Sequence, residues 1–430
     1  MAKKEVRASG PLRGDVRVPG DKSLSHRALL FPALAEGTSK VRGLQGGLDV
    51  RATRDCLTRL GVVFREEEGA LLIEGRGIGG LSEPEVILDC ANSGTTMRLM
   101  SGVLAGHPFL SVLTGDEHLI KRPMARVLDP LREMGALALG RREDTLAPLV
   151  FRGGSLRSLT WKSPVASAQV KSAILLAGLH ARGVTWVEEP KPTRDHTERM
   201  LGGMGAKVFY EDGNRVGIKG GGSLSPIEMD VPGDPSSAAF WAGAALMVPG
   251  SDVTIRNICL NEGRTGFFNL LRRMGAEVEV KATHEAAGEP VGDVRVRYST
   301  LEAIEVLPEE VPAAIDEFPV FGAVASIARG ETVIRGAEEL RFKESDRIEA
   351  VAGELAKAGV PVKTFEDGMA ITGLAKLSPA TFSSHGDHRL AMSMAVLSLA
   401  IPGGGVVEGA EAASVSYPEF WNTLATLSAK

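Results

Sequence analysis

The tetrapeptide Val18-Pro19-Gly20-Asp21 occurs a second time as Val231-Pro232-Gly233-Asp234, 213 positions later (231 minus 18) in a chain of 430 residues. Pro-Gly is a common turn pair, so either copy alone predicts only a turn. The separation, however, equals three times 71, and a unit of about that length recurs along the chain. We therefore expect two domains of three units each, with hinge crossovers near 18–21 and 231–234.

Each unit begins with an Ala/Leu-rich helix that turns at glycine into a short Val-rich strand. An amphipathic helix follows, ends at a second glycine, and leads into two further strands. We expect these second glycines to be helix C-caps; they are Gly61, Gly135, Gly205, Gly275 and Gly359. Six units, the last cut short, predict an α/β fold with one domain at 21–232 and the other at 1–20 plus 233–430.

The composition and charge of the chain exclude several classes of function. The chain is 43% hydrophobic and carries a formal net charge of −5, which fits a folded globular protein and argues against nucleic-acid binding. There is no apolar run of about 20 residues, so we expect no membrane span. Cys56, Cys90 and Cys259 form neither a disulfide framework nor a zinc motif, which favours a reducing, cytoplasmic location.

Cations stand where helix dipoles disfavour them. Lys22 and Arg27 lie at the start of the first helix, Arg389 at the start of the last, and Lys343 and Arg347 where another helix should begin. A helix N-terminus already carries partial positive charge, so added cations are unfavourable unless an anion binds there. Surface charge would explain any one of them. Three such clusters in equivalent places of one repeat instead indicate binding of anionic ligands.

Further anion-binding candidates lie in loops and at other helix starts. Arg122 and Arg194 are loop cations, and arginine suits planar contacts to carboxylate or phosphate. Small polar residues supply hydrogen bonds, although a serine before a helix is more often only an N-cap. These polar candidates are Ser23, Ser167, Gln169 and the Asn92-Ser93-Gly94-Thr95 turn.

Two carboxylates have the surroundings of acid–base groups. Asp316 precedes Glu317-Phe318-Pro319 at a helix start, where its alternative role is an N-cap. Glu344 lies between Lys343 and Arg347, so its alternative role is an ion pair with one of them. The sequence alone leaves both alternatives open.

These motifs together resemble one family, 5-enolpyruvylshikimate-3-phosphate synthase (3-phosphoshikimate 1-carboxyvinyltransferase), over essentially the whole chain. The specific pieces are Gly20 to Arg27, Asn92 to Arg98, Lys121-Arg122-Pro123, Ser167-Ala168-Gln169, Lys343 to Arg347 and Asp387-His388-Arg389. The resemblance implies an inside-out α/β barrel of two similar domains, each with three βαβαββ units, and an active site in the interdomain cleft.

The reaction that the resemblance implies transfers the enolpyruvyl group of phosphoenolpyruvate to the 5-hydroxyl of 3-phosphoshikimate. It proceeds by addition and elimination through a tetrahedral intermediate, without a metal or organic cofactor. The family supplies aromatic amino acid (chorismate) biosynthesis and is the target of the inhibitor glyphosate. We expect a cytoplasmic monomer that binds these two small molecules and neither nucleic acid nor membrane.

The resemblance also implies residue roles. Asp316, Glu344 and Lys22 would be catalytic. The residues implied for 3-phosphoshikimate are Lys22, Ser23, Arg27, Ser167, Ala168, Gln169, Arg194, Asp316 and Lys343. Those implied for phosphoenolpyruvate are Lys22, Asn92, Gly94, Arg122, Gln169, Arg347 and Arg389.

Two positions depart from the pattern of many members. Val415 replaces a lysine that contacts phosphoenolpyruvate, and Thr193-Arg194 stands where a tyrosine often contacts the shikimate moiety. Both departures resemble the branch that includes glyphosate-tolerant members. Gly94, however, is not the alanine that crowds the inhibitor in some of them, so sensitivity stays open.

Two other functions share part of this pattern. The enolpyruvyl transferase for UDP-N-acetylglucosamine shares the fold, but it has Lys-Asn where this chain has Lys22-Ser23. It also has a loop cysteine where this chain has Asp116-Glu117-His118. A non-catalytic phosphate-ligand sensor would have no use for Asp316 and Glu344. Phosphate release with each acceptor distinguishes all three.

Overall fold

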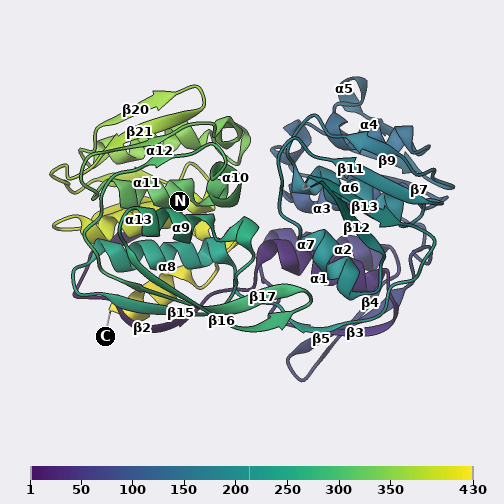
Figure 1. The fold of residues 1–430 in the computed structure, drawn as a ribbon, viewed down its shortest axis with the longest axis horizontal. Coiled ribbons are helices and arrows are strands. Elements are labelled where there is room, and N and C mark those ends of the chain that lie inside the picture. The colour runs from purple at the N-terminus through teal and green to yellow at the C-terminus, as the bar shows by residue number, and fades with distance from the viewer. Residues whose placement is uncertain (1, 213, 429–430) are drawn as a thin grey trace. The chain divides into compact units, whose positions relative to one another are not determined.

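The computed structural model describes residues 2–212 and 214–428 and contains two compact units (Figure 1). The N-unit comprises Gly20–Val231 and Glu285–Glu289. The C-unit comprises Met1–Pro19, Pro232–His284 and Pro290–Lys430. Both are built from repeated helix and strand units, and each is described by itself.

The described part of the N-unit has three four-stranded sheets, in the orders β14-β3-β5-β4, β6-β7-β9-β8 and β10-β11-β13-β12. In each sheet the first pair of strands is parallel and the other two pairs are antiparallel. The strands are β3 (Glu36–Arg42), β4 (Val63–Glu67), β5 (Ala70–Arg76), β6 (Leu88–Asp89), β7 (Leu110–Thr114), β8 (Leu137–Gly140), β9 (Leu146–Arg152), β10 (Thr160–Lys162), β11 (Val184–Glu188), β12 (Val208–Glu211), β13 (Arg215–Lys219) and β14 (Glu228–Asp230). The helices are α1 (Lys22–Ala33), α2 (Leu48–Arg59), α3 (Gly94–Leu104), η1 (Leu119–Lys121), α4 (Ala125–Glu133), α5 (Arg141–Asp144), α6 (Ala168–Gly178) and α7 (His196–Gly203).

The C-unit repeats this order in the sheets β16-β17-β15-β2 and β18-β19-β21-β20, and in a three-stranded sheet β1-β23-β22. Its strands are β1 (Lys3–Val6), β2 (Arg13–Arg17), β15 (Asp252–Cys259), β16 (Glu277–Ala286), β17 (Glu289–Arg297), β18 (Glu305–Val306), β19 (Glu331–Ile334), β20 (Val362–Phe365), β21 (Gly368–Thr372), β22 (Thr381–Ser383) and β23 (Gly405–Glu408). Its helices are α8 (Pro235–Met247), η2 (Glu262–Arg264), α9 (Gly266–Arg273), α10 (Val311–Ala314), η3 (Ile315–Glu317), α11 (Phe318–Ala325), η4 (Glu338–Phe342), α12 (Arg347–Lys357), α13 (His388–Ala400), η5 (Ala410–Val415) and α14 (Phe420–Ser428).

The two Val-Pro-Gly-Asp copies perform the same local task. Each follows a short strand, β2 or β14, and each aspartate caps the next central helix. Asp21 Oδ1 accepts from Leu24 N at 2.8 Å at the start of α1, and Asp234 Oδ1 accepts from Ser236 N at 2.8 Å at the start of α8. The strand before each copy pairs with the first strand that follows the other copy. Thus β2 pairs with β15, and β14 pairs with β3.

The core of each unit is helical. All 13 residues of α8 are buried, and α8, α11 and α13 pack against one another. In the N-unit α3 packs on α6, and α1 is buried along most of its length. A helix that is apolar on every side belongs in a core. The structure thus confirms a mixed α/β fold of repeated units with helices inside, and none of its described helices could cross a membrane.

The predicted helix C-caps are confirmed. The glycines that follow α2, α4, α7, α9 and α12 have left-handed φ angles. The values are +88° at Gly61, +107° at Gly135, +93° at Gly205, +91° at Gly275 and +89° at Gly359. A residue with a Cβ is strained at such angles, which is why these positions reveal the repeat so clearly in the sequence.

Three histidines with lowered pKa values should make the N-unit acid-sensitive: His26 and His107 are buried and His180 is half-buried. Burial, aided by the nearby His107 ring, lowers the pKa of His180 to about 3, and burial lowers that of His26 to about 3 as well. Unfolding returns both to about 6.5, so the unfolded chain binds protons that the folded chain does not. We expect the free energy of unfolding to have its full value above pH 6.5. Between pH 6 and 4 it should fall by about 1.4 kcal/mol per pH unit for each of His26 and His180.

Chemical denaturation of the variant His180→Asn across this range tests that expectation. The free energy of unfolding of this variant should fall less steeply with decreasing pH than that of the wild type, by about 1.4 kcal/mol per pH unit. Replacement of the exposed His284 by asparagine should leave the slope unchanged. Equal slopes for wild type and His180→Asn would refute a neutral His180.

Candidate functional site

Lys22 is the first residue of α1 and faces the start of α2. Its Nζ lies 3.2 Å from Asp49 Oδ2, with the two side chains 21% and 14% exposed. The backbone carbonyl of Asp49 accepts from Thr96 Oγ1 at 3.3 Å, which joins this pair to the start of α3. A half-buried cation is thus held at a helix N-terminus, where its own helix contributes no acidic side chain in the first turn.

Arg27 lies one turn further into α1 and is almost completely buried. It donates to neutral oxygens: Nε to Thr197 Oγ1 at 2.8 Å, Nη1 to Ser23 O at 3.0 Å and Nη2 to Ser172 Oγ at 2.9 Å. Burial lowers its pKa to about 10, opposed chiefly by Glu198, while the charge of Arg194 lowers it further. The positive charges of Arg27 and Arg194 therefore repel each other, and a bound anion would offset that repulsion.

The Asn92 turn orients Arg122. Arg122 Nη2 donates to Asn92 Oδ1 at 2.6 Å, and Asn92 Nδ2 donates to Asp116 Oδ2 at 2.8 Å. Asp116 Oδ1 in turn accepts from the backbone amides of His118 and Leu119 at the start of η1. This chain of hydrogen bonds fixes the position of the guanidinium, and neither its geometry nor Asp116 could be predicted from the sequence.

Gly94 begins α3 immediately beside that guanidinium. A Cβ at Gly94 would lie 3.2 Å from Arg122 Nη1 and 3.5 Å from Arg98 Nη1. Arg98 also donates to Gln169 Oε1, and Gln169 Nε2 donates to Thr95 Oγ1 at 2.8 Å. Arg98 is a further cation of this group, and its position one helical turn after Gly94 is the sequence signal that indicates it.

The remaining N-unit candidates lie at the start of α6 and before α7. Ser167 is the N-cap of α6, accepting from Val170 N at 3.4 Å, and Ala168 is the first helical residue. The capping alternative for Ser167 is therefore realised. Arg194 lies in the connection between β11 and α7 and is half-buried.

In the C-unit, Arg347 gathers the candidate carboxylates. It is the first residue of α12 and is 1% exposed. Its Nη2 donates to Glu344 Oε2 at 2.7 Å, its Nε donates to Asp387 Oδ2 at 2.8 Å, and its Nη1 lies 3.6 Å from Asp316 Oδ1. Burial alone would lower the pKa of Arg347, but the charges of Asp387, Glu344 and Asp316 outweigh it and raise that pKa.

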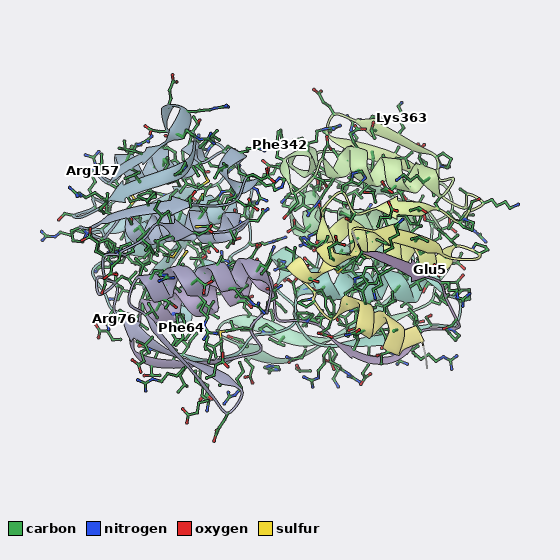
Figure 2. The ribbon with its side chains drawn as sticks, turned by 180° about the vertical axis from the view of Figure 1, so that it is seen from behind. Glu5, Phe64, Arg76, Arg157, Phe342 and Lys363 are labelled. Carbon is green, nitrogen blue, oxygen red and sulfur yellow. The ribbon has the colours of Figure 1, made fainter. Side chains whose placement is uncertain are left out.

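Asp316 is not the helix N-cap that the sequence left open. It lies in η3, α11 begins at Phe318, and Glu317 occupies the cap position, with its side chain bonded to Ser236 Oγ and not to the first turn of α11. Asp316 Oδ1 instead accepts from Lys343 Nζ at 3.4 Å. The alternative for Glu344, an ion pair with Arg347, is realised. Lys343 follows the exposed Phe342, which is labelled in Figure 2.

Arg389 lies at the start of α13, whose N-cap is Asp387. Asp387 Oδ1 accepts from Arg389 N at 2.8 Å, and Arg389 Nη1 lies 3.8 Å from Glu317 Oε1. Burial would raise the pKa of Asp387, but Arg347 outweighs it and holds the pKa below the usual value. The contact between Arg347 and Asp387 was not predicted from the sequence, because it depends on packing between segments 40 residues apart.

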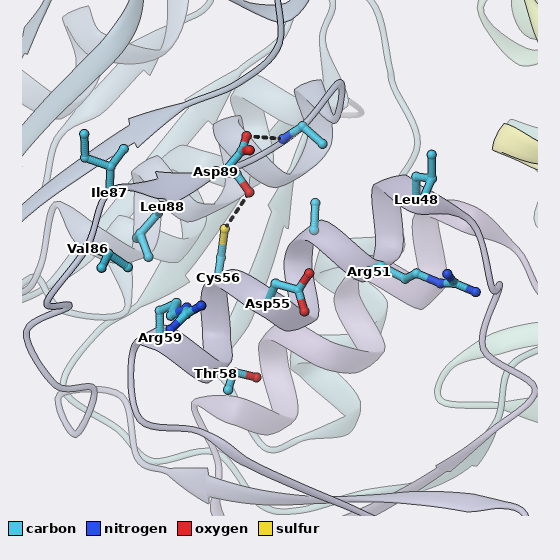
Figure 3. A pocket seen from close by; sticks show the side chains of 12 residues that line it. Leu48, Arg51, Asp55, Cys56, Thr58, Arg59, Val86, Ile87, Leu88 and Asp89 are labelled. Atoms are coloured by element: carbon cyan, nitrogen blue, oxygen red, sulfur yellow. Dashed lines mark hydrogen bonds between the residues drawn. The ribbon is translucent and has the colours of Figure 1, made fainter.

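The candidates thus form two groups, one in each unit. The larger group of candidates lies in the N-unit, at the starts of α1, α3 and α6. In the C-unit, the start of α12 brings Asp316, Lys343 and Glu344 around Arg347, with Arg389 on the neighbouring helix. A cavity of about 720 Å³ on α2 and β6, lined by Leu48, Asp55 and Ile87 among others, contains none of these candidates (Figure 3). Among described residues no three His, Cys, Asp or Glu side chains form a metal-binding group.

Comparison with known proteins decides the family. A family model described as EPSP synthase (3-phosphoshikimate 1-carboxyvinyltransferase) matches residues 6–424. The chain belongs to the EPSP synthase family. The 3-phosphoshikimate 1-carboxyvinyltransferase of Carboxydothermus hydrogenoformans is 50% identical over 425 residues, covering 99% of both chains. That of Geotalea daltonii is 50% identical over 410 residues, covering 95% of both.

Solved EPSP synthase structures have the same fold. One from Acinetobacter baumannii superposes with a TM-score of 0.89 at 42% identity, covering 99% of this chain and 97% of that chain. The enolpyruvyl transferase NikO from Streptomyces tendae gives a TM-score of 0.80 at 17% identity, covering 98% of this chain and 96% of that chain, which is a likeness of fold alone. The family predicted from the sequence motifs is thereby confirmed.

Proposed function

We infer that the chain catalyses the reaction of the EPSP synthase family. It transfers the enolpyruvyl group of phosphoenolpyruvate to the 5-hydroxyl of 3-phosphoshikimate and releases phosphate, a step of the shikimate pathway to aromatic amino acids. The observation that carries this inference is the family match over residues 6–424. The relatives at 50% identity carry the same enzyme name.

The N-unit supplies most of the proposed binding residues. Arg27 and Arg194, whose charges influence each other, suit the phosphate of 3-phosphoshikimate. Arg122, held by Asn92 beside Gly94, suits phosphoenolpyruvate. The full proposed set for 3-phosphoshikimate is Lys22, Ser23, Arg27, Ser167, Ala168, Gln169, Arg194, Asp316 and Lys343. The set for phosphoenolpyruvate is Lys22, Asn92, Gly94, Arg122, Gln169, Arg347 and Arg389.

The proposed chemistry uses two carboxyl groups. Asp316 takes the proton of the 5-hydroxyl as that oxygen bonds to C2 of phosphoenolpyruvate, and Glu344 delivers a proton to the methylene carbon. Loss of phosphate from the tetrahedral intermediate, with return of a proton from the new methyl group to Glu344, restores the double bond, and the proton held by Asp316 leaves with the phosphate. Each positioned acid or base contributes about 10²–10⁴-fold. Lys22, Lys343 and Arg347 stabilise the charge that develops on oxygen.

We further propose that the crossovers near 18–21 and 231–234 act as hinges when the substrates bind. All proposed site residues belong to one chain, so a monomer has the complete set. Among the described residues Cys56, Cys90 and Cys259 form no disulfide, which supports a cytoplasmic location. We propose no metal or organic cofactor, since proton transfer and electrostatic stabilisation account for each step.

The deciding experiment measures phosphate release from phosphoenolpyruvate with two acceptors. We expect release with 3-phosphoshikimate, together with formation of 5-enolpyruvylshikimate 3-phosphate. We expect none with UDP-N-acetylglucosamine. Release with the nucleotide sugar would assign the other enolpyruvyl transfer, and binding of 3-phosphoshikimate without release would leave a sensor.

Gly94→Ala tests the proposed phosphoenolpyruvate pocket and its inhibitor. The added methyl would crowd Arg122 Nη1 at 3.2 Å, so the guanidinium must move by a few tenths of an ångström. We expect the KM for phosphoenolpyruvate to rise by roughly 3–30-fold and the glyphosate inhibition constant to rise more. Inhibition curves before and after the substitution measure this. Unchanged curves would place both ligands away from Gly94.

A further inference from the structure

A buried cluster of charged side chains lies next to the segment that carries Arg194. Lys171 of α6 places its Nζ 2.8 Å from Glu189 Oε2, at the end of β11, and 2.8 Å from Glu198 Oε1, in α7. The three side chains are only 4%, 4% and 2% exposed. Nothing in the proposed chemistry uses these residues, although ions so deeply buried carry a large desolvation cost.

The cluster also acts electrostatically on the proposed phosphate site. Lys171 pairs with both glutamates, and the charge of Glu198 acts on Arg27 as well. Glu198 is the strongest of the charges that oppose the fall in the pKa of Arg27. For Lys171 itself, burial is outweighed by Glu198 and Glu189, so its pKa is raised and it stays charged.

The cluster also contacts Thr193 and adjoins the residues that hold Arg27. Thr193, the residue before Arg194, donates its hydroxyl to Glu189 Oε1 and accepts from Lys171 Nζ at its carbonyl, 3.4 Å away. On the other side, Arg27 is held by Ser172 and Thr197, which are next in sequence to Lys171 and Glu198. Ser172 and Thr197 bond to each other at 2.6 Å.

We propose that Thr193 and the Lys171–Glu189–Glu198 cluster are positioning residues that hold Arg194 for the phosphate of 3-phosphoshikimate. This inference rests on the proposed binding role of Arg194. A long side chain on an unrestrained loop pays a conformational-entropy cost each time it binds, and fixing its backbone beforehand removes part of that cost. Fixation of Thr193 on two sides acts directly at the peptide bond that Arg194 shares with it.

A double-mutant cycle distinguishes positioning from general stability. The variants are Thr193→Val, Arg194→Met and both together, assayed for kcat and for the KM of each substrate. We expect Arg194→Met to raise the KM for 3-phosphoshikimate about 10–100-fold and Thr193→Val to raise it about 3–10-fold. In the Arg194→Met background, Thr193→Val should add nothing, because its effect passes through Arg194.

Controls make the assignment specific. The variant Thr193→Ser retains a hydroxyl, so its KM for 3-phosphoshikimate should equal that of the wild type. The variant Thr58→Val, at an exposed threonine, should leave this KM unchanged. The KM for phosphoenolpyruvate should stay within about twofold in both Thr193 variants. Glu189→Gln, which removes the charge without changing size, provides a second variant and should also raise only the KM for 3-phosphoshikimate.

The outcomes separate this inference from the function on which it rests. If Arg194→Met raises the KM but Thr193→Val has either no effect or an equal effect in both backgrounds, the positioning role is wrong and the binding role stands. If Arg194→Met leaves the KM unchanged while phosphate release persists, both roles of this segment fail and the enzyme activity stands.

Discussion

Replacing Asp316 by asparagine is expected to lower kcat by about 10²–10⁴-fold while leaving the KM for phosphoenolpyruvate within about threefold. Asparagine keeps the shape of the side chain but cannot take the proton of the 5-hydroxyl. The carboxylate lies 3.4 Å from Lys343 Nζ and 3.6 Å from Arg347 Nη1. Without this negative charge, Lys343 and Arg347 attract anions more strongly, so binding of phosphoenolpyruvate should not weaken.

This split between kcat and KM identifies the role. Loss of a structural contact would lower the melting temperature, whereas loss of the base lowers kcat. Because Asp316 is also proposed to contact 3-phosphoshikimate, the KM for that substrate can change, and the KM for phosphoenolpyruvate is the one that should stay constant. Steady-state phosphate release measures both constants, with the exposed Glu302→Gln as a carboxylate-to-amide control in the same unit. A kcat within twofold of the wild-type value would exclude Asp316 as the base.

The fold could be predicted from the sequence where one residue type meets a strict backbone demand. Gly61 and its four counterparts adopt left-handed φ angles, so they recur visibly at each helix end. Asp21 and Asp234 likewise cap equivalent helices. Short strands gave no comparable signal, because β6 and β18 contain two residues each and have no measurable periodicity.

The site shows the same limit. Single cations such as Lys22 and Arg347 could be selected because they break a local rule at helix starts. Their partners could not, since Asp49 is 27 residues from Lys22 and Asp387 is 40 residues from Arg347. Asp316 shows the opposite case: its local sequence permitted an N-cap, and the contact with Lys343 replaced it. Tertiary packing decides such pairings, and no local spacing encodes them.

Replacing Lys22 by methionine is expected to reduce kcat/KM for both substrates by about 10²–10³-fold. Methionine approximates the length of the side chain but removes the ammonium group at the start of α1. The loss has a second component, since Asp49 Oδ2 loses its partner at 3.2 Å and adds negative charge where anions should bind. Steady-state constants for each substrate measure the effect, and the exposed Lys207→Met should stay within twofold.

The two components can be separated by adding Asp49→Asn to Lys22→Met. Removing the carboxylate relieves the repulsion, so the double variant should recover several-fold in the KM of both substrates. It should recover nothing in kcat, because the ammonium group that stabilises the transition state is still missing. Recovery of kcat together with the KM would mean that Lys22 serves only to neutralise Asp49, and that the chemistry depends on the other cations.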